Sequence, residues 1–288
     1  MTKKTPDNRS ACALLAVLVL YNRRLEESKT FTSLFRTSPA WDERVHLFVY
    51  DNSPVPMHAP GAFDDSGMHI HYLSDTSNPG VSRAYNAGGR MARQLQKPYL
   101  LFLDQDTLFP RDALSRYFNA IESYSDSPVV APVLFHNGRI HSPCRQMLHA
   151  HLPLRAIEPG RVSTRGKGLL NSGMCIKLDA FDRVGGFDEK IPLDFADRDF
   201  MRRYGRHFDS FFLLDMACAH GFPDKESLDA REALTRFGYY CQGAKHSIKG
   251  CADACSLASM AFLRAARLSL RYKSVRFLSL LLRSFLKS

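Results

Sequence analysis

Two carboxylates stand two residues apart at the end of an apolar run, in the stretch LLFLDQDTLF at residues 100–109. In an extended chain Asp104 and Asp106 would point to the same side, because side chains alternate along a strand. Two close carboxylates repel each other unless something positive lies between them. A hard divalent cation, Mg²⁺ or Mn²⁺, fits this position because it takes oxygen ligands and shares them with phosphates. The alternative is that the aspartates only cap the following helix.

A second acidic cluster lies downstream, in IPLDFADRDFMRRY at residues 191–204. It contains Asp194, Asp197 and Asp199, and its presence favours the metal site over simple helix capping. Asp199 and Arg203 are four residues apart, a spacing typical of ion pairs on a helix surface. Asp197 falls at the expected start of that helix, where it either caps the helix or serves as a general base toward a substrate.

Polar side chains also follow two other apolar runs. Tyr21 and Asn22 follow residues 14–20, and Asp51, Asn52 and Ser53 end or follow residues 45–51. In open α/β sheets, ligands bind beyond the carboxyl ends of the strands. These strand ends, together with Asp104, Gln105 and Asp106, are therefore expected to outline one site.

The elements that must position these residues alternate along the chain. Strands are predicted at residues 14–20, 45–51, 68–73, 99–104, 129–135 and 211–218, and helices at 24–37, 81–96 and 111–124. Residues 136–168 have weak periodicity and many Gly, Pro, His and Arg residues, and no element is predicted there. Strand and helix alternation indicates an α/β fold with a mostly parallel, doubly wound, Rossmann-like sheet and helices on both faces.

The ordered motifs resemble the inverting family 2 glycosyltransferases of the GT-A fold. The resemblance covers residues 12–222 and rests on VYDNS, NPGVSRAYNAG, the Asp-x-Asp strand end, and NSGMCIKL followed by a Gly-Gly-Phe-Asp-Glu turn and an acidic helix start. It is similar in particular to the bacterial rhamnosyltransferase-like branch, through the form Asp194-Phe195-Ala196-Asp197.

The resemblance implies a role for each motif. Asp197 would be the catalytic base, and Asp106 with His220 would hold Mg²⁺ or Mn²⁺. From the residues alone, a hydrogen-bonded core histidine is the favoured interpretation of His220. The implied donor-binding residues are Tyr21, Asn22, Asp51 at the nucleobase, Asn52, Asn78, Gly80, Asn86, Asp104 and Gln105. The implied acceptor-side residues are Asn171, Ser172, Gly173, Asp194 and Arg203.

The expected reaction moves a sugar, such as a rhamnosyl group, from a dTDP- or UDP-linked donor to a glycan or lipid-linked saccharide in surface polysaccharide assembly. A nucleotidyltransferase is the alternative enzyme, but such enzymes carry a Gly-rich loop after the first strand, where this chain has YNRRLEE. A nucleic-acid-binding protein is the other alternative. It would need a basic face on the fold itself, and no nucleic-acid partner is expected.

The net charge of +10 is concentrated at the C-terminus, where residues 256–288 hold seven basic residues and no acidic one. We therefore expect a flexible segment at 1–10, a GT-A domain at 11–235 and a basic helical segment at 236–288. Residues 256–288 either bind an anionic membrane surface or pack on the domain. Seven cysteines without a disulfide framework indicate reduced thiols and hence a cytoplasmic protein, which membrane binding by residues 256–288 would place on the inner face of the membrane. Cys241, His246, Cys251 and Cys255 lie close in sequence, but their spacing fits no standard zinc site, so the three cysteines are expected to be buried thiols in a helical segment.

Overall fold

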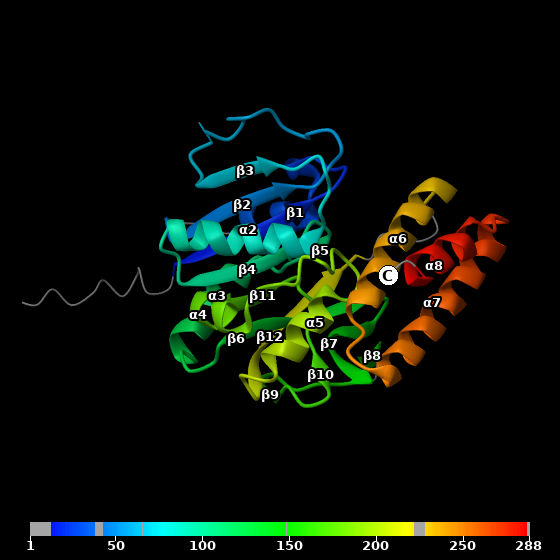
Figure 1. Cartoon of the computed structure of the whole chain (residues 1–288). Coiled ribbons are helices and arrows are strands. Elements are labelled where there is room, and N and C mark those ends of the chain that lie inside the picture. The colour runs from blue at the N-terminus through cyan, green and yellow to red at the C-terminus, as the bar shows by residue number, and fades with distance from the viewer. Residues whose placement is uncertain (1–12, 38–42, 65, 148, 222–227, 287–288) are drawn as a thin grey trace, which may run out of the picture.

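The computed structural model describes residues 13–37, 43–64, 66–147, 149–221 and 228–286. The segment expected to be flexible, residues 1–10, lies outside this range. A twelve-stranded sheet forms the centre of the molecule (Figure 1), with the main strand order β10-β7-β6-β11-β4-β1-β2-β3. Its strands are β1 (Leu14–Leu20), β2 (Val45–Asp51), β3 (Ile70–Ser74), β4 (Tyr99–Asp104), β5 (Thr107–Leu108), β6 (Val129–His136), β7 (Arg139–Met147), β8 (Ala150–Leu154), β9 (Gly160–Ser163), β10 (Lys167–Gly168), β11 (Met174–Lys177) and β12 (Ser210–His220).

Strand β1 explains why the sheet is covered on both faces. All seven of its residues are buried, and alternate side chains enter two different cores. Val17 packs in the core that includes α2 (Val81–Gln94), α4 (Leu178–Val184) and α5 (Ala196–Tyr204). Leu18 packs in the opposite core. That core includes η2 (Leu25–Glu27), α1 (Lys29–Phe31), η3 (Thr32–Arg36) and α3 (Ala113–Ser123). The continuous apolar run is thus the pattern of a strand buried on both sides.

The sheet has a parallel part and a mixed part. Strands β3, β2, β1 and β4 are parallel to one another. Strand β11 is antiparallel to both β4 and β6, and β6 is parallel to β12. The α/β fold with helices on both faces is confirmed, and the predicted strands at 14–20, 45–51 and 99–104 match β1, β2 and β4 to the residue. Strands β7 to β10 occupy the stretch for which no element was predicted.

Helix α2 reaches the sheet closely because of its glycines. A Cβ atom on Gly88 would lie 2.3 Å from Cγ2 of Val17, and one on Gly89 would lie 2.6 Å from Cε1 of Phe181. Neither distance is compatible with a side chain. The Asn-x-Gly pattern at residues 86–88 therefore contributes to helix packing, in addition to the pocket role that the resemblance implies.

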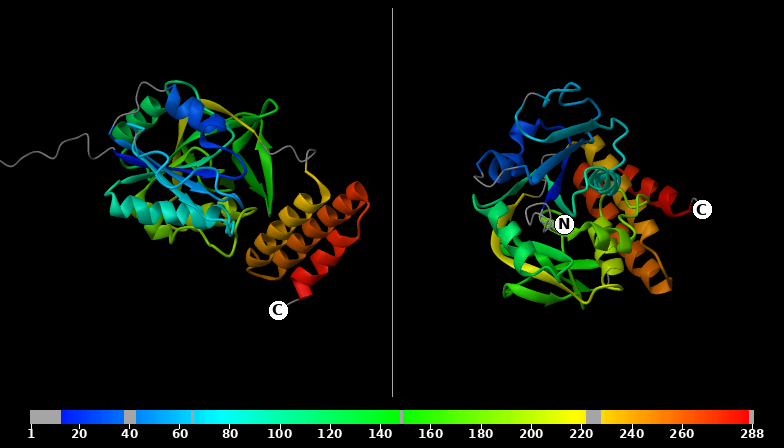
Figure 2. Two further views of the ribbon diagram at one scale, coloured as in Figure 1. Left: turned by 90° about the horizontal axis from the view of Figure 1, so that it is seen from above. Right: turned by 90° about the vertical axis from the view of Figure 1, so that its left-hand side faces the viewer.

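The C-terminal helices form a bundle beside the sheet domain, which is clearest in the left view of Figure 2. They are α6 (Ala230–His246), α7 (Cys251–Tyr272) and α8 (Arg276–Leu286). The bundle has its own core around Phe237, Ala261 and Phe277. Cys241 is buried in it, but Cys251 and Cys255 are exposed free thiols, so the expectation of buried thiols was wrong for these two. Within the described helices, none combines the length and apolar character needed to cross a bilayer.

Candidate active site

The carboxyl ends of β1, β2 and β4 lie side by side, as predicted. In the sheet register Leu20 is opposite Asp51, and Val19 is opposite Asp104. Side chains tie the strand ends together. The Tyr21 N–H donates to Oε1 of Gln105 at 2.9 Å, and the Asn22 N–H donates to Oγ of Ser53 at 2.8 Å. These contacts join the three strand ends into one surface at the carboxyl edge of the sheet, which we call the shelf.

Asp51 is fully buried in this shelf, and both oxygens of its carboxylate accept hydrogen bonds. Oδ1 accepts from the Ser53 N–H at 2.9 Å, while Oδ2 accepts from the Met57 N–H at 2.8 Å and the Tyr72 hydroxyl at 2.6 Å. Burial alone would raise the pKa of Asp51, but these hydrogen bonds outweigh it and hold the pKa below its usual value. Beside it, Oδ1 of buried Asn52 has no partner among the described residues. The predicted contacts of both residues with the donor remain predictions.

The Asn78–Gly80 segment lies against residues 191–192. Gly80 has a φ of +93°, and a Cβ atom there would lie 2.2 Å from the carbonyl oxygen of Pro192. Two hydrogen bonds fasten this approach, from the Val81 N–H to Pro192 O at 2.7 Å and from the Ser82 hydroxyl to Ile191 O at 2.5 Å. Segments more than a hundred residues apart in sequence are thus held together at the site.

Asn86 and Asn78 are held by more distant parts of the chain. The Asn86 amide donates to the carbonyl oxygen of Phe187 at 2.9 Å and accepts from the Phe187 N–H at 2.8 Å. Its side chain therefore clamps the Gly-Gly-Phe-Asp-Glu turn. The Tyr239 hydroxyl of α6 donates to the carbonyl oxygen of Asn78 at 3.2 Å. The C-terminal bundle consequently touches the segment predicted to shape the nucleotide pocket.

Three carboxylates converge on the hydroxyl of Tyr85, a residue that was not predicted as part of the site. The Tyr85 hydroxyl donates to Oδ1 of Asp104 at 2.9 Å. Burial raises the pKa of Tyr85, and the charges of Asp104, Asp197 and Asp106 raise it further. Asp104 at the end of β4, Asp106 in the turn after it and Asp197 of α5 therefore face the same space around this hydroxyl. In the sequence, the only sign of this hydroxyl is that Tyr85 lies next to Asn86 in AYNAG.

Asp106 has the properties expected of a cation ligand. Its Oδ1 is buried without a hydrogen-bond partner among the described residues. Burial, followed by the charge of Asp104, raises the pKa of Asp106 to about 7. A buried carboxylate oxygen without a donor fits a divalent cation, which would supply the missing positive charge.

His220 lies beside Asp106, with Nδ1 3.8 Å from Oδ1. The same Nδ1 makes a 2.7 Å hydrogen bond with Oγ1 of Thr107, and burial lowers the pKa of His220. The ring is thus held in its neutral form, the form that ligates metals. No group of three or more His, Cys, Asp or Glu side chains in the described residues forms a complete metal cage. Asp106 and His220 would need further oxygen ligands, such as those of a diphosphate.

The Asn171–Gly173 turn supports the end of β4. The Asp104 N–H donates to Oγ of Ser172 at 3.2 Å, and Oγ of Ser172 is 2.8 Å from Oγ1 of Thr107. The Gly173 N–H donates to Phe102 O at 2.7 Å, and a Cβ atom on Gly173 would lie 2.7 Å from Cγ of Pro132. The structure therefore places Ser172 and Gly173 directly behind the carboxylates. Oδ1 of buried Asn171 has no partner among the described residues.

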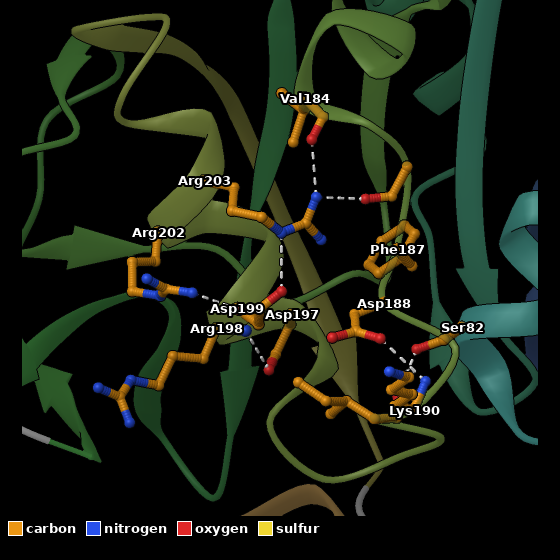
Figure 3. Close-up of polar contacts among 12 residues, drawn as sticks. Ser82, Val184, Phe187, Asp188, Lys190, Asp197, Arg198, Asp199, Arg202 and Arg203 are labelled. Carbon is orange, nitrogen blue, oxygen red and sulfur yellow. Dashed lines mark hydrogen bonds and ion pairs between the residues drawn. The ribbon is translucent and has the colours of Figure 1, made fainter. Parts of the chain in front are cut away.

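Asp197, in the first turn of α5, is half-buried and accepts a single hydrogen bond from the described residues. Its only hydrogen bond within the described residues comes from the Arg198 N–H to Oδ1, at 2.7 Å (Figure 3). Burial raises the pKa of Asp197 above its ordinary value; the charge of His151 opposes this, and those of Asp104 and Asp194 add to it. A carboxylate with a raised pKa and free oxygens can accept a proton.

Both carboxylate oxygens of Asp199, two residues further on, accept hydrogen bonds from arginines. Its Oδ1 accepts from Arg202 at 2.7 Å and its Oδ2 from Nε of Arg203 at 2.8 Å. The pair with Arg203 was expected on the helix surface, which was wrong, because Asp199 is buried. Arg203 also donates to the carbonyl oxygens of Val184 and Gly186 at 2.7 and 2.6 Å. Figure 3 shows its guanidinium extending toward Val184, so Arg203 secures the wall of the site.

Asp194 connects the site to the C-terminal bundle. Its Oδ1 is 3.6 Å from Nη1 of Arg264 in α7, and the Arg264 guanidinium lies 4.1 Å from the ring centre of Tyr240. A Cβ atom on Gly243 of α6 would lie 2.4 Å from the Asp194 carbonyl oxygen. Arg264 therefore faces the catalytic domain, so this arginine of the basic tail is a packing residue.

The family model described as Glycosyl transferase family 2 matches residues 16–175, more than half of the chain. The chain belongs to this family. The matched range includes Asp51, Asp104 and Asp106, whereas Asp197 and His220 lie beyond it. Family membership favours a glycosyltransferase over the nucleotidyltransferase and nucleic-acid-binding alternatives.

Individual relatives agree with this assignment. The curated "dTDP-rhamnosyl transferase RfbF" of Shigella flexneri is 20% identical over 199 residues, which are 66% of this chain and 62% of that protein. The chain thus spans less than two thirds of this relative. The crystal structure of S. aureus TarS 1-349 superimposes with a TM-score of 0.52 at 13% identity, covering 85% of this chain and 69% of TarS. The complex of TarS 1-349 with UDP gives the same TM-score and identity. These structures confirm the GT-A fold.

Proposed function

We propose that the protein transfers a sugar from a nucleoside diphosphate sugar to a saccharide hydroxyl, with inversion at the anomeric carbon. The observation that carries the proposal is the state of Asp197. Its carboxylate is half-buried, has a raised pKa, and faces the same space as Asp104 and Asp106. A general base beside a cation-binding edge is what direct displacement requires.

The reaction would proceed in one step. An oxygen of Asp197 takes the proton of the acceptor hydroxyl as that oxygen forms a bond to the anomeric carbon. The bond from this carbon to the phosphate oxygen breaks on the opposite face, and its electron pair leaves with the diphosphate. Protons and charge balance, because the carboxylate becomes a carboxylic acid and the diphosphate gains the negative charge. Such a displacement needs no covalent intermediate.

Asp106, with His220 beside it, would hold a divalent cation. When bound, Mg²⁺ or Mn²⁺ would supply positive charge where the diphosphate leaves. Asp104 would stay in place through the Tyr85 hydroxyl and the Ser172 hydroxyl. The buried oxygen of Asp106 without a partner supports this assignment, which the sequence had already suggested.

The proposed donor is a dTDP- or UDP-linked sugar, and the acceptor a glycan or lipid-linked saccharide. The name of the Shigella relative supports dTDP-rhamnose as the first donor to test, and the UDP complex of TarS supports UDP sugars as the second. Hydrolysis of each purified donor should be measured with Mn²⁺ and with excess chelator. We expect hydrolysis of one donor class that depends on the cation. Equal hydrolysis in chelator would refute the metal role, and no hydrolysis of any nucleotide sugar would count against the function.

We further propose that the outer face of the bundle attaches the enzyme to the inner, anionic face of a membrane. This face carries exposed apolar side chains, namely Phe262, Leu263, Leu270, Val275 and Leu282. Basic residues lie among them, namely Arg267, Arg271, Lys273, Arg276 and Arg283. Apolar insertion together with about 1 kcal/mol per basic residue near anionic lipid would give reversible binding.

The membrane proposal is best tested with substitutions, since deleting α7 and α8 would open the core that they share with α6. The intact chain should sediment with phosphatidylserine vesicles at low salt and dissociate at high salt. Leu263→Ser with Leu270→Ser, and separately Arg267→Gln with Arg271→Gln, should weaken sedimentation. Equal sedimentation with neutral vesicles, or no effect of either pair, would leave the bundle as a packing element.

A further inference from the structure

A second hollow lies on the far side of α5 from the shelf of strand ends. It has a volume of about 880 Å³ and is bounded by β9, β10 and the C-terminal half of α5. Five cationic side chains line this hollow, with one acidic side chain, Asp209: Arg161, Arg165, Lys167, Arg202 and Arg206. We call it the basic groove. The overall charge of the chain did not indicate it, because the excess of basic residues lies in the C-terminal segment.

Most of the charge in the basic groove is uncompensated. Arg161 pairs with Asp126 at 2.5 Å, and Arg202 pairs with Asp199. By contrast, the side chains of Arg165, Lys167 and Arg206 make no ion pair or hydrogen bond with any part of the chain that the structure describes. A concave surface that gathers unpaired like charges attracts an oppositely charged ligand.

The groove shares helix α5 with the proposed catalytic base. Asp197 lies in the first turn of this helix, and Arg202 five residues further on, which is roughly 8 Å along the axis and about 140° around it. Arg206 follows the last turn. An acceptor that presents a hydroxyl to Asp197 would therefore have to bend around α5 to enter the groove.

The sheet provides a second connection. Cys144 of β7 is opposite Gly168 of β10 in the register, and Lys167 precedes Gly168. Burial raises the pKa of the Cys144 thiol to about 12, and the charge of Asp197 contributes to this shift. Helix α5, which carries Asp197, packs directly against β10, which carries Lys167.

We propose that the basic groove binds phosphate groups carried by the saccharide acceptor, beyond the hydroxyl that receives the sugar. Arginine forks bind phosphate oxygens in pairs, and a phosphate ester brings up to two charges to the three unpaired cations. The hydroxyls of Ser163, Thr164 and Ser210 also line the groove. The exposed apolar side chains that a lipid surface would need lie on the C-terminal bundle instead. This inference rests on the proposed function, since it identifies the class of its acceptor.

Binding can be measured without transfer. The probe is an oligosaccharide bearing phosphate monoesters, compared with the same oligosaccharide after phosphatase treatment, in the presence of saturating UDP and Mn²⁺ to occupy the donor site. The groove variant combines Arg165→Gln, Lys167→Gln and Arg206→Gln. The matched control removes three exposed arginines that do not line the groove and form no ion pair within the described residues, through Arg36→Gln, Arg90→Gln and Arg111→Gln.

We expect the groove variant to bind the phosphorylated probe about tenfold more weakly than the control variant does, with a difference that shrinks at high salt. Phosphatase treatment should remove the difference. Equal losses in the two variants would overturn the proposal, because they would indicate attraction to the overall charge. Equal competition by inorganic phosphate or by anionic vesicles would also overturn it, in favour of a free-ion or headgroup site.

A kinetic measurement separates this inference from the proposed function. Donor hydrolysis by the groove variant should equal that of the wild type, while KM for the phosphorylated acceptor should rise and kcat should stay unchanged. Normal hydrolysis with an unchanged KM would refute the groove as an acceptor site and leave the function intact. Loss of hydrolysis in wild type and variant alike would refute the function, whereas the binding result would still stand.

Discussion

The two sides of helix α5 carry carboxylates in opposite electrostatic states. Asp199 is buried between two arginines, and although burial alone would raise its pKa, the hydrogen bonds from Arg202 and Arg203 hold it below the usual value. Asp197 has no cationic partner at hydrogen-bonding distance within the described residues, and burial raises its pKa. Asp199 thus belongs to a structural ion pair, whereas Asp197, two positions earlier on the same helix, can accept a proton. Proximity in sequence says little about role; the atoms around each carboxylate decide it.

The largest expected effect comes from removing the proposed base. Asp197→Asn should keep donor binding and lower transfer by at least about 10²-fold, the usual contribution of a general base. Steady-state transfer and a donor titration would measure this. Asp179→Asn is the matched control, because Asp179 accepts the N–H of its following residue in the same way as Asp197 but is exposed. An inactive Asp194→Asn beside an active Asp197→Asn would identify a different carboxylate as the base.

The same substitution should not destabilise the fold at neutral pH. A carboxyl whose pKa is raised by folding stabilises the native state only at low pH, and that stabilisation is lost as pH rises through the raised pKa. Asn removes the buried charge, so the melting temperature of Asp197→Asn should equal or exceed that of the wild type. A clear fall in melting temperature would mean that Asp197 has a structural role like that of Asp199.

Asp199→Asn should show the reverse pattern. It leaves the buried guanidinium of Arg203 without a charged partner, which costs about 3 kcal/mol or more of unfolding free energy. Because the pKa of Asp199 is lowered, its contribution is present at neutral pH and is lost as pH falls through that pKa. Chemical denaturation of the variant and of Asp182→Asn would measure the difference. Asp182 pairs with Arg93 at the surface, where the loss should stay below about 1 kcal/mol.

The smallest effect concerns the bundle behind Asp194. Arg264→Met keeps most of the side-chain volume but removes the charge 3.6 Å from Asp194. The negative charge of Asp194 would then act more strongly on Asp197, so the acidic limb of the transfer rate should move to higher pH. Arg267→Met, on the exposed face of the same helix, is the control and should leave the limb in place. A shift of equal size in both variants would exclude a specific contact.

The sequence predicted strands β1, β2 and β4 much better than strands β7 to β10. Strands β1, β2 and β4 are largely apolar runs buried on both faces, so their first and last residues can be recognised in the sequence. Strand β7 mixes exposed, partly buried and buried residues without a regular period, and β8, β9 and β10 are short, so the sequence shows no clear strand pattern there. Asp104 and Asp106 were expected to lie together through strand alternation, but β4 ends at Asp104 and Asp106 lies in the following turn, so the turn and not the alternation positions the second carboxylate. Tyr85 and the Arg264 contact with Asp194 depend on packing between segments distant in the sequence, which no local pattern encodes.

The most direct test of the central claim is the pH dependence of transfer in a single turnover, with saturating donor and at several Mn²⁺ concentrations. The rate should fall on the acidic side with an apparent pKa above the ordinary aspartate value, because burial raises the pKa of Asp197. A limb that arises from Asp106 would move with metal concentration, whereas one that arises from Asp197 should stay fixed. The account predicts a fixed limb that disappears from the residual activity of Asp197→Asn. A rate that stays constant down to the pH where ordinary aspartates protonate, or a limb unchanged in Asp197→Asn, would contradict it.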